Sequence, residues 1–495
     1  MNILLVYPSY PDTFWGFRHA LRFIGKKAAY PPVGLLTVAA MLPEHWNVRL
    51  VDTNLHQLEE DHLAWADYVF ISAMSIQRDS ALKVIDRCLK YGVKTVAGGP
   101  LFTSDYSSFP QVDHLVLGEA EVTLPRFLKD LSEGCPAQVY RTSEMADVND
   151  APAPRWNLIN FDDYSTMCVQ YSRGCPYDCE FCDITVLFGH KPRIKKPELV
   201  LAELDALYAS GWRGGVFFID DNFIGNKKAL KHKLLPALIG WMREHKYPFS
   251  NLVTQTSVEL ADDDQLVAAM VEASFDKVFI GIETPDKQSL AECGKTHNLK
   301  SDMLSNVKKL QSSGIQVHGG FILGFDNDSE DVFSRMSQFI NESGIVTSMV
   351  GLLNAPIGTR LYKRMVSEHR MHGQISGDNT DCSINFTPKM DYKVLIDGYR
   401  RVLEEIYQPD AYYRRVKKFL GSYKITKKLR GGVSLENLRG LVLSVYHIGL
   451  RSKVRKHFWK LIGWTCFRRP RLLPLAITMA IYGEHFMRHY QITVE

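Results

Sequence analysis

Three cysteines on one short loop are the residues of this sequence whose types and spacing point most directly to chemistry. Cys175, Cys179 and Cys182 follow the spacing C-x-x-x-C-x-x-C. Three thiolates this close can hold three irons of a [4Fe–4S] cluster, whereas protein-held clusters usually take four cysteines. The loop therefore predicts a cluster with one iron open to another ligand.

A structural zinc site and three unrelated core thiols are the alternatives. Zinc sites take four ligands, usually as two pairs with C-x-x-C-like spacing, and no second pair lies near this loop in the sequence. Chance spacing is an option because the chain has 9 cysteines. The whole surrounding motif, Ser-Arg-Gly-Cys-Pro-Tyr-Asp-Cys-Glu-Phe-Cys-Asp, favours the iron–sulfur interpretation.

This motif resembles that of the radical SAM superfamily. In that family the open iron binds the amino and carboxylate groups of S-adenosylmethionine (SAM), and an electron from the cluster releases a 5′-deoxyadenosyl radical. The resemblance implies that Cys175, Cys179 and Cys182 are the metal ligands and the catalytic residues. It also implies that Phe181 lies near the adenine.

Composition indicates a globular protein of more than one domain. The chain has 495 residues, of which 45% are hydrophobic and 23% charged, as in soluble proteins. Its start is typical of a buried strand and not of a signal peptide, and no run of about 18 apolar residues predicts a transmembrane helix. Its 9 scattered cysteines, an odd number, favour a reducing cytoplasm over a disulfide framework.

Short apolar runs separated by helical patterns fill the first part of the chain. The runs are residues 3–7, 48–51, 68–72, 93–97 and 114–117. They predict βαβ units and a Rossmann-like parallel sheet. Ligands on such a sheet bind at the carboxyl ends of the strands, where Gly98, Gly99 and Gly118 are placed.

A second series of strand and helix patterns begins at Met167. After a first strand that ends at the cysteine loop, strands are expected over residues 215–219, 252–257, 277–283, 316–323 and 348–354. Six βα units predict a partial (β/α)6 barrel, in which active groups gather at the carboxyl-end loops. Helices are expected to follow over residues 392–406, 410–419, 435–450 and 472–488.

The order of these parts resembles the cobalamin-dependent class of radical SAM enzymes. The resemblance implies an α/β fold in four parts. They are a Rossmann-like cobalamin-binding domain at residues 1–142, a linker at 143–164, the radical SAM barrel at 165–375 and a helical C-terminal domain with a basic tail at 376–495.

Cobalamin is expected to bind without a histidine below the cobalt. The motif D-x-H-x-x-G of His-on cobalamin proteins is replaced by Pro8-Ser9-Tyr10-Pro11, so the resemblance implies that a bulky side chain faces the cobalt. The loops at 74–77, 98–103 and 118–121 would surround the nucleotide tail, with Gly98, Gly99 and Gly118 in contact. The alternative is a vestigial domain that binds nothing.

Polar residues at the ends of three barrel strands are candidates for binding SAM. Asp220, Asp221 and Asn222 follow the second strand, where the family contacts the SAM amino group, and an ammonium needs carboxylate or carbonyl oxygens. The alternative is a helix N-cap, and one residue can cap while another binds. Ser257 offers a hydroxyl to the ribose or the carboxylate, unless it is only a turn residue. Glu283 is a lone acid at a buried strand end, costly unless paired, which favours contact with SAM.

The fifth strand resembles the adenine-contacting segment G-x-I-x-G-x-x-E of the family. Gly320, Ile322 and Gly324 match this pattern, while Asn327 replaces the glutamate. Glycines let the backbone approach a flat ring, although on their own they are weak support. After the sixth strand, Pro356 and Gly358 would close over the adenine or the substrate.

Basic residues are concentrated near the C-terminus, although the net charge of the chain is only +4. Such a tail suggests an anionic partner. Residues 472–487, flanked by Arg468, Arg469 and Arg471, could lie on a membrane surface. The alternative is a solvated helical face. No aromatic–basic alternation suggests nucleic acid.

The sequence of residues 170–420 resembles that of the hopanoid C-2 methylase group most. That resemblance rests on two motifs, Asp-Asp-Asn-Phe-Ile-Gly-Asn-Lys-Lys and Val-Gly-Leu-Leu-Asn-Ala-Pro. It implies a methyltransferase that uses a [4Fe–4S] cluster, SAM and cobalamin on an unactivated carbon of a small-molecule, lipid or polycyclic substrate. It also implies an electron donor such as ferredoxin or flavodoxin. The alternatives are a cyclase or oxidoreductase without methyl transfer, and a non-catalytic iron–sulfur sensor.

Overall fold

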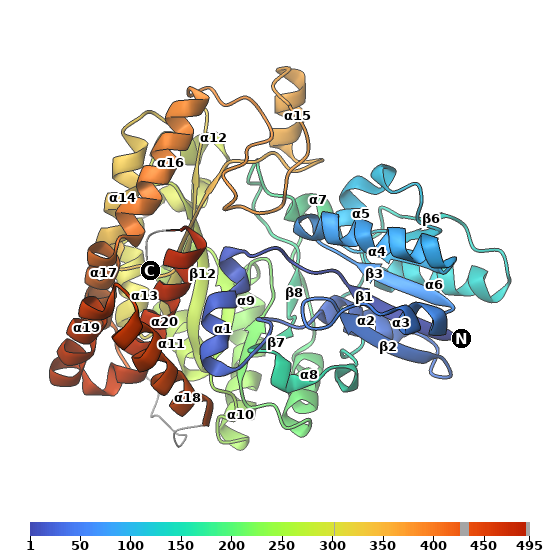
Figure 1. Cartoon of the computed structure of the whole chain (residues 1–495), viewed down its shortest axis with the longest axis horizontal. Coiled ribbons are helices and arrows are strands. Elements are labelled where there is room, and N and C mark those ends of the chain that lie inside the picture. The colour runs from blue at the N-terminus through green and yellow to red at the C-terminus, as the bar shows by residue number, and fades with distance from the viewer. Residues whose placement is uncertain (301, 426–434, 492–495) are drawn as a thin grey trace.

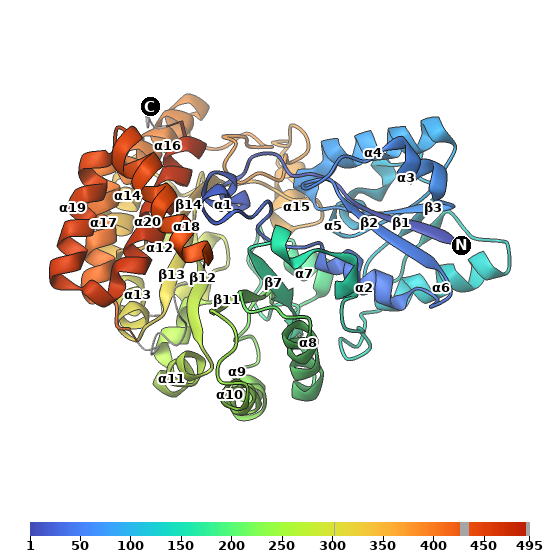
Figure 2. The same ribbon diagram turned by 60° about the horizontal axis from the view of Figure 1, so that its bottom comes forward.

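Two six-stranded parallel sheets and a group of C-terminal helices form the chain, as the computed structural model shows for residues 1–300, 302–425 and 435–491 (Figure 1). The N-terminal sheet and the C-terminal helices lie at opposite ends of the molecule, and the second sheet stands between them (Figure 2). The predicted α/β class with a Rossmann-like sheet, a partial barrel and C-terminal helices is confirmed.

The N-terminal sheet has the strand order β2-β1-β3-β4-β5-β6. Its strands are β1 (Asn2–Tyr7), β2 (Asn47–Asp52), β3 (Tyr68–Ser72), β4 (Lys94–Gly98), β5 (His114–Val116) and β6 (Val139–Tyr140). Leu4 and Val6 of β1 pack into one core, while Ile3 and Leu5 pack into another on the opposite face. Because both faces are buried, the strands are almost continuously apolar.

Helices cover both faces of this sheet. They are α2 (Val33–Met41), α3 (Glu60–Trp65), α4 (Arg78–Tyr91), α5 (Pro100–Asp105) and α6 (Ala120–Ser132). Side chains of α3, α4 and α5 fill one core, and side chains of α2 and α6 fill the other. The carboxyl ends of the strands remain as the place where a ligand can lie.

The second sheet has the strand order β14-β13-β12-β11-β10-β7 and does not close on itself. Its strands are β7 (Thr166–Val169), β10 (Gly215–Phe218), β11 (Leu252–Thr256), β12 (Phe275–Glu283), β13 (Gln316–Leu323) and β14 (Ser348–Leu352). The helices around it are α8 (Pro197–Ala209), α9 (Lys227–Ala229), α10 (Leu235–Glu244), α11 (Asp264–Glu272), α12 (Lys287–Glu292), α13 (Met303–Ser312) and α14 (Val332–Ser343). The two edge strands, β7 and β14, leave a lateral gap.

Residues 13–29 of the N-terminal part span this gap. The indole N–H of Trp15 lies 2.9 Å from the sulfur of Met349 on β14. At the other edge, the carbonyls of Ala28 and Ala29 accept hydrogen bonds from the backbone of Ser165 and Thr166 at the start of β7, at 3.0 and 3.1 Å. Between them, α1 (Arg18–Ile24) packs against the C-terminal helices, which the sequence did not predict.

The C-terminal helices follow α15 (Arg360–Ser367). They are α16 (Tyr392–Tyr407), α17 (Pro409–Ser422), α18 (Leu435–Ser444), α19 (Arg455–Arg468) and α20 (Leu473–His489). The helix predicted over 435–450 divides into α18 and a π-helix, η9 (Val445–Arg451). Helix α19 was not predicted.

Helix α20 corrects the expectation that residues 472–487 lie on a membrane surface. Ala476, Met479 and Phe486 are fully buried against the rest of the molecule. The segment is therefore part of the core, and its small and aromatic residues pack against α1, α17 and α19. No helix among the described residues is both long enough and apolar enough to cross a bilayer.

Candidate functional site

The three cysteines lie on the loop between the hairpin strand β8 (Ser172–Arg173) and helix α7 (Ile184–Phe188). All three are half-buried free thiols. Burial is the largest cause that raises the pKa of each thiol. Cys175 adds to it at Cys179, whose pKa is raised to about 11 in total, and Cys175 and Cys179 add to it at Cys182. The thiols are therefore near one another, and they need positive charge to ionise, which iron supplies.

Three thiols on one loop offer one ligand to each of three irons of a [4Fe–4S] cluster. Within the described part of the chain, no three His, Cys, Asp or Glu side chains converge closely enough to hold one metal ion. In a cubane each thiolate binds a different iron, so the sulfurs stand apart. A tetrahedral zinc site would instead need four converging ligands.

The cysteine loop is clamped from two sides through Glu180. The backbone N–H of Glu180 donates to the carbonyl of Cys293 at 2.8 Å, and its carbonyl accepts from the N–H of Leu361 at 2.9 Å. The Glu180 carboxylate binds the guanidinium of Arg364 with two hydrogen bonds, of 2.7 and 3.0 Å. Bidentate pairs of this kind fix orientation as well as position.

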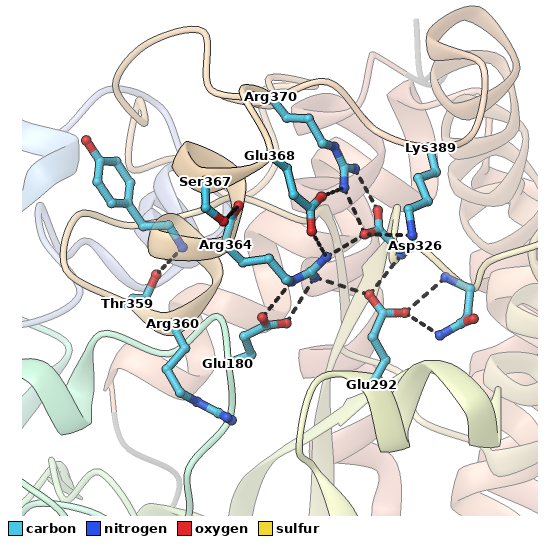
Figure 3. A network of polar contacts seen from close by, with 12 residues as sticks. Glu180, Glu292, Asp326, Thr359, Arg360, Arg364, Ser367, Glu368, Arg370 and Lys389 are labelled. Atoms are coloured by element: carbon cyan, nitrogen blue, oxygen red, sulfur yellow. Dashed lines mark hydrogen bonds and ion pairs between the residues drawn. The ribbon is translucent and has the colours of Figure 1, made fainter.

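Arg364 belongs to a wider polar network at this end of the barrel (Figure 3). It also binds Asp326 at 2.6 Å and Glu292 at 3.4 Å, and Arg370 binds Asp326 from the other side at 2.6 Å. Burial alone would raise the pKa of Asp326, but the hydrogen bonds from Arg370 and Arg364 outweigh it and lower this pKa to about 2. No local pattern in the sequence predicts this network.

Glu283 is paired, which corrects the expectation of a lone acid. The ammonium of Lys295 forms an ion pair with the Glu283 carboxylate, and both side chains are buried. The charge of Lys295 also lowers the pKa of Cys175 and Cys179, against the larger effect of burial. Glu283 and Lys295 therefore place a cation beside the cysteine loop. Glu283 has a left-handed backbone, with φ 64°, at the end of β12.

The three residues after β10 have different surroundings. Asp220 is fully buried and accepts hydrogen bonds from the Ser172 hydroxyl at 2.5 Å and the Tyr171 backbone at 3.3 Å, and burial raises its pKa to about 7. Asp221 accepts from the backbone of Gly174 at 2.7 Å. Both carboxylates thus hold the start of the cysteine loop.

Of the three residues after β10, Asn222 is the one whose side-chain oxygen has no hydrogen-bond partner among the described residues. Its side chain lowers the pKa of the Cys175 thiol, against the larger effect of burial. Its Oδ1 atom is also buried. A buried carbonyl oxygen without a donor is costly, and the ammonium group of SAM would satisfy it. The residues present therefore suit SAM beside Cys175.

Ser257 lies beside the cysteine loop, next to residues that the sequence did not single out. Its hydroxyl is 3.5 Å from the hydroxyl of Tyr177, which also hydrogen-bonds Glu259. The Tyr177 ring stacks on His297 with centroids 3.8 Å apart. Burial lowers the pKa of His297 to about 4, so its ring is neutral at pH 7.

The adenine segment brings together some of its predicted residues. The rings of Phe181 and Phe325 lie 6.2 Å apart, and Ile322 packs on the same small apolar cluster. Gly324 needs its left-handed backbone, with φ 103°. Gly320 has a second reason to be glycine, because a Cβ there would lie 2.7 Å from the ring of Phe279 on β12.

The residues after this segment and after β14 make structural contacts. Asn327, which replaces the family glutamate, donates its side-chain amide to Glu292 at 2.8 Å. The Pro356 carbonyl accepts from the Thr359 hydroxyl at 2.7 Å, at the start of α15. Gly358 has φ 87° and lies against Val186 of α7.

Gly99 and Gly118 line a pocket of about 250 Å³ between the N-terminal sheet and the cysteine-loop hairpin. Gly98 and Gly99 are confined by neighbours, since a Cβ would meet the Val116 carbonyl at 2.7 Å and the Ser72 hydroxyl at 2.6 Å, respectively. Gly118 has φ 79° and no atom within 4 Å of such a Cβ, so it leaves open space for a ligand. This cradle suits part of a cobalamin.

Ion pairs tie this pocket to the cysteine-loop hairpin. Arg173 of β8 binds Glu121 at 2.9 Å, and Arg193 of β9 (Arg193–Ile194) binds Glu119 at 2.6 Å. Both acids follow Gly118, where the nucleotide tail is expected. The cofactor ends of the two sheets therefore face each other.

Comparison with known proteins agrees with this architecture. The B12 binding domain matches residues 27–128, and the Radical SAM superfamily matches residues 169–340. Residues 359–495 match a domain of unknown function, DUF4070. The chain belongs to the radical SAM superfamily, in the class that carries a B12-binding domain.

Its relatives include named methyltransferases. An uncharacterized methyltransferase of Synechocystis sp. is 38% identical, over 99% of this chain and 92% of its own length. The hopanoid C-2 methylase of Rhodopseudomonas palustris is 34% identical, over 93% of this chain and 88% of its own length. The protein is an enzyme of the cobalamin-dependent radical SAM methyltransferase family, and its cofactors are a [4Fe–4S] cluster, SAM and cobalamin.

Solved structures share the fold. The cobalamin-dependent SAM radical enzyme OxsB, with aqua-cobalamin and SAM bound, superposes with a TM-score of 0.62 at 14% identity, covering 99% of this chain and 79% of that one. The radical SAM methyltransferase TsrM from Kitasatospora setae gives a TM-score of 0.58 at 15% identity, covering 74% and 76%.

Proposed function

We propose that this protein transfers a methyl group to an unactivated carbon of a lipid or polycyclic substrate. The observation that carries the proposal is the pairing of Arg173 and Arg193 with Glu121 and Glu119, which joins the cysteine loop to the cobalamin domain. The site that generates the radical and the site that supplies the methyl group then lie next to each other. The similarity to a hopanoid C-2 methylase along 93% of the chain supports the substrate class.

In this proposal the cluster, when bound, supplies the electron that cleaves SAM, and cobalamin supplies the methyl group. Cys175, Cys179 and Cys182 would hold three irons. Asn222 would accept a hydrogen bond from the SAM amino group, Ser257 would offer its hydroxyl to the ribose or the carboxylate, and Glu283 would contact the ribose or the methionyl part. The residues that would lie around the adenine are Gly320, Ile322, Gly324, Pro356 and Phe181, and those beside the cobalamin tail would be Gly98, Gly99 and Gly118.

The amino ends of the barrel strands border a large cavity whose wall is partly apolar. It has a volume of about 1540 Å³ and begins at the amino ends of the barrel strands, opposite the cysteine loop. Its walls include Phe217 and Val253 of the barrel and Ile481 and Tyr482 of α20. Trp15 also lines the cavity, with its ring 5.4 Å from that of Phe279. Charged side chains such as Lys26, Glu272 and Lys277 also line the cavity, so its wall is of mixed polarity.

Product analysis tests the reaction class. The anaerobically reconstituted protein, given SAM, a reductant, cobalamin and a lipid extract, should form 5′-deoxyadenosine and S-adenosylhomocysteine in equal amounts, together with a methylated lipid. Formation of 5′-deoxyadenosine without S-adenosylhomocysteine would contradict methyl transfer. That outcome would favour a cyclase or an oxidoreductase.

Two partners complete the proposal. The electron comes from a small carrier such as ferredoxin or flavodoxin, because the family chemistry requires an external one-electron donor. A lipid substrate lies in a bilayer, so the enzyme meets its substrate by peripheral contact with a membrane surface. Residues 472–487 are too buried to make that contact.

A further inference from the structure

Large apolar side chains are exposed together on the C-terminal helices α18, η9 and α19. We call this group the α18–α19 face; its members are Leu438, Leu441, Val442, Tyr446, Leu450, Trp459 and Phe467. The exposed fractions reach 57% at Val442, 58% at Leu450 and 91% at Phe467. Single exposed apolar residues are ordinary, whereas a group of them marks an interaction surface.

The spacing of four of these residues places them on one side of the segment 438–450. Leu438, Val442, Tyr446 and Leu450 are each four residues apart, so they follow one another along a helical segment. The indole N–H of Trp459 donates to the carbonyl of Gly449 at 2.9 Å, which sets the ring beside Leu450. The buried side of the same segment packs toward α1 and α20. The apolar side is left without a partner in the described chain.

Positive charge surrounds the α18–α19 face. Between positions 438 and 471 the sequence has no Asp or Glu. The exposed basic residues there are Arg439, Arg451, Lys453, Arg455, Lys456, Lys460, Arg468 and Arg471. None of them forms an ion pair within the part of the chain that the structure describes. The guanidinium of Arg451 lies over the Tyr446 ring, 4.5 Å from its centre, so charge and apolar surface are interleaved.

We propose that the α18–α19 face docks the enzyme on an anionic lipid bilayer. Apolar side chains enter the acyl boundary while the basic side chains meet the lipid phosphates, as in interfacial helices. A second copy of the chain is a poorer occupant, because two identical basic faces would repel each other. Charge complementarity therefore selects the bilayer.

Docking by this face also suits a lipid substrate, and in that respect it rests on the proposed function. Helix α18 packs against α1, whose Leu21 and Ile24 line the large cavity. The bilayer would thus lie near the helix that borders the cavity. Binding to lipid is nevertheless measured without turnover, so a failure of methyl transfer would leave the docking result intact.

Vesicle flotation of the cluster-loaded full chain tests the proposal. Two vesicle types are used, phosphatidylcholine alone and phosphatidylcholine mixed with phosphatidylglycerol. The wild type should float with the anionic vesicles and much less with the neutral ones. Leu450→Glu and Lys456→Glu should each lower the partition coefficient on anionic vesicles by about tenfold or more. High salt should weaken binding as well.

Matched controls come from the N-terminal domain. Leu89 and Lys90 are exposed neighbours on α4, far from the C-terminal helices, so Leu89→Glu and Lys90→Glu make the same charge changes elsewhere. These variants should float like the wild type. Circular dichroism and SAM cleavage confirm that each variant is folded, and Val442→Glu provides a second apolar test.

Two outcomes would overturn the proposal. The first is equal flotation of Leu450→Glu, Lys456→Glu and the wild type. The second is a wild-type dimer that Leu450→Glu converts to a monomer, which would make the α18–α19 face a contact between two copies of the chain.

Discussion

The carboxylate of Glu180, between two cysteines of the loop, is held by the guanidinium of Arg364 through hydrogen bonds of 2.7 and 3.0 Å. The two residues are 184 positions apart. The geometry of the cysteine loop is therefore set partly by α15, which follows the last strand of the barrel in the chain. Arg364 is a positioning residue, because its contacts are with the loop and not with a reacting atom.

Replacing this arginine should loosen the cluster. In Arg364→Lys the positive charge remains, but the pair of guanidinium N–H donors that binds both oxygens of the carboxylate is lost. We expect fewer irons retained per chain after gel filtration and SAM cleavage lowered by about tenfold, since small misplacements of reacting groups are costly. The control is Lys363→Ala, at the neighbouring position of α15. Full iron retention and activity in Arg364→Lys would contradict a positioning role.

Asn222 should contribute to SAM affinity through its unpaired oxygen. Asn222→Leu keeps a similar volume and removes that acceptor, so the dissociation constant for SAM should rise about tenfold, typical of a hydrogen bond to a charged group. Asn222→Asp restores an oxygen and should recover most of the affinity. Equilibrium dialysis of the cluster-loaded protein measures both. An unchanged constant in Asn222→Leu would show that SAM does not use this atom.

Two glycines with the same backbone strain separate cobalamin binding from folding. Gly118 and Gly134 have φ of 79° and 76°, and a Cβ at either position would have no atom within 4 Å. Only Gly118 lines the pocket beside the cysteine-loop hairpin. Gly118→Leu should therefore lower the cobalamin bound per chain, read from its absorption, whereas Gly134→Leu should not. Iron content should be the same in both variants, and equal cobalamin in both would argue against this pocket.

Asp328 should make stability depend on pH between about 4 and 6. Burial raises its pKa to about 6, although Ser289 and the backbone of Gly324 and Phe325 donate hydrogen bonds to it. The folded state binds this proton more tightly than the unfolded chain does. The contribution of the protonated Asp328 carboxyl to the free energy of unfolding is therefore complete below about pH 4 and is lost as the pH rises through 6. Wild type should gain about 1 kcal/mol in unfolding free energy from pH 7 to pH 5 relative to Asp328→Asn. Parallel pH profiles of the two proteins would contradict this assignment.

Most strands of both sheets could be predicted from the sequence, because parallel strands covered on both faces are short continuous apolar runs. The helices α1 and α19 were missed for different reasons. Helix α1 has only seven residues and is stabilised by packing on α18 and α20. Helix α19 mixes basic and apolar residues on all sides, since part of its apolar surface is exposed.

The candidate site was predictable only where local spacing encodes it. The cysteine motif and the strand-end glycines are visible in the sequence, whereas partners of the loop come from distant segments. Lys295 and Arg364 pair with acids 12 and 184 positions away, and no local pattern announces either pair. A buried acid at a strand end, such as Glu283, is nevertheless a general signal that a cation lies nearby.

An open-iron cluster held by Cys175, Cys179 and Cys182 is the central claim, and SAM cleavage by cysteine variants tests it most directly. The anaerobically reconstituted wild type should contain about four irons per chain and form 5′-deoxyadenosine when reduced with SAM. Cys179→Ala should lose this product, while Cys466→Ala, at an exposed cysteine elsewhere, should retain it. Equal 5′-deoxyadenosine formation by Cys179→Ala and the wild type would contradict the central claim.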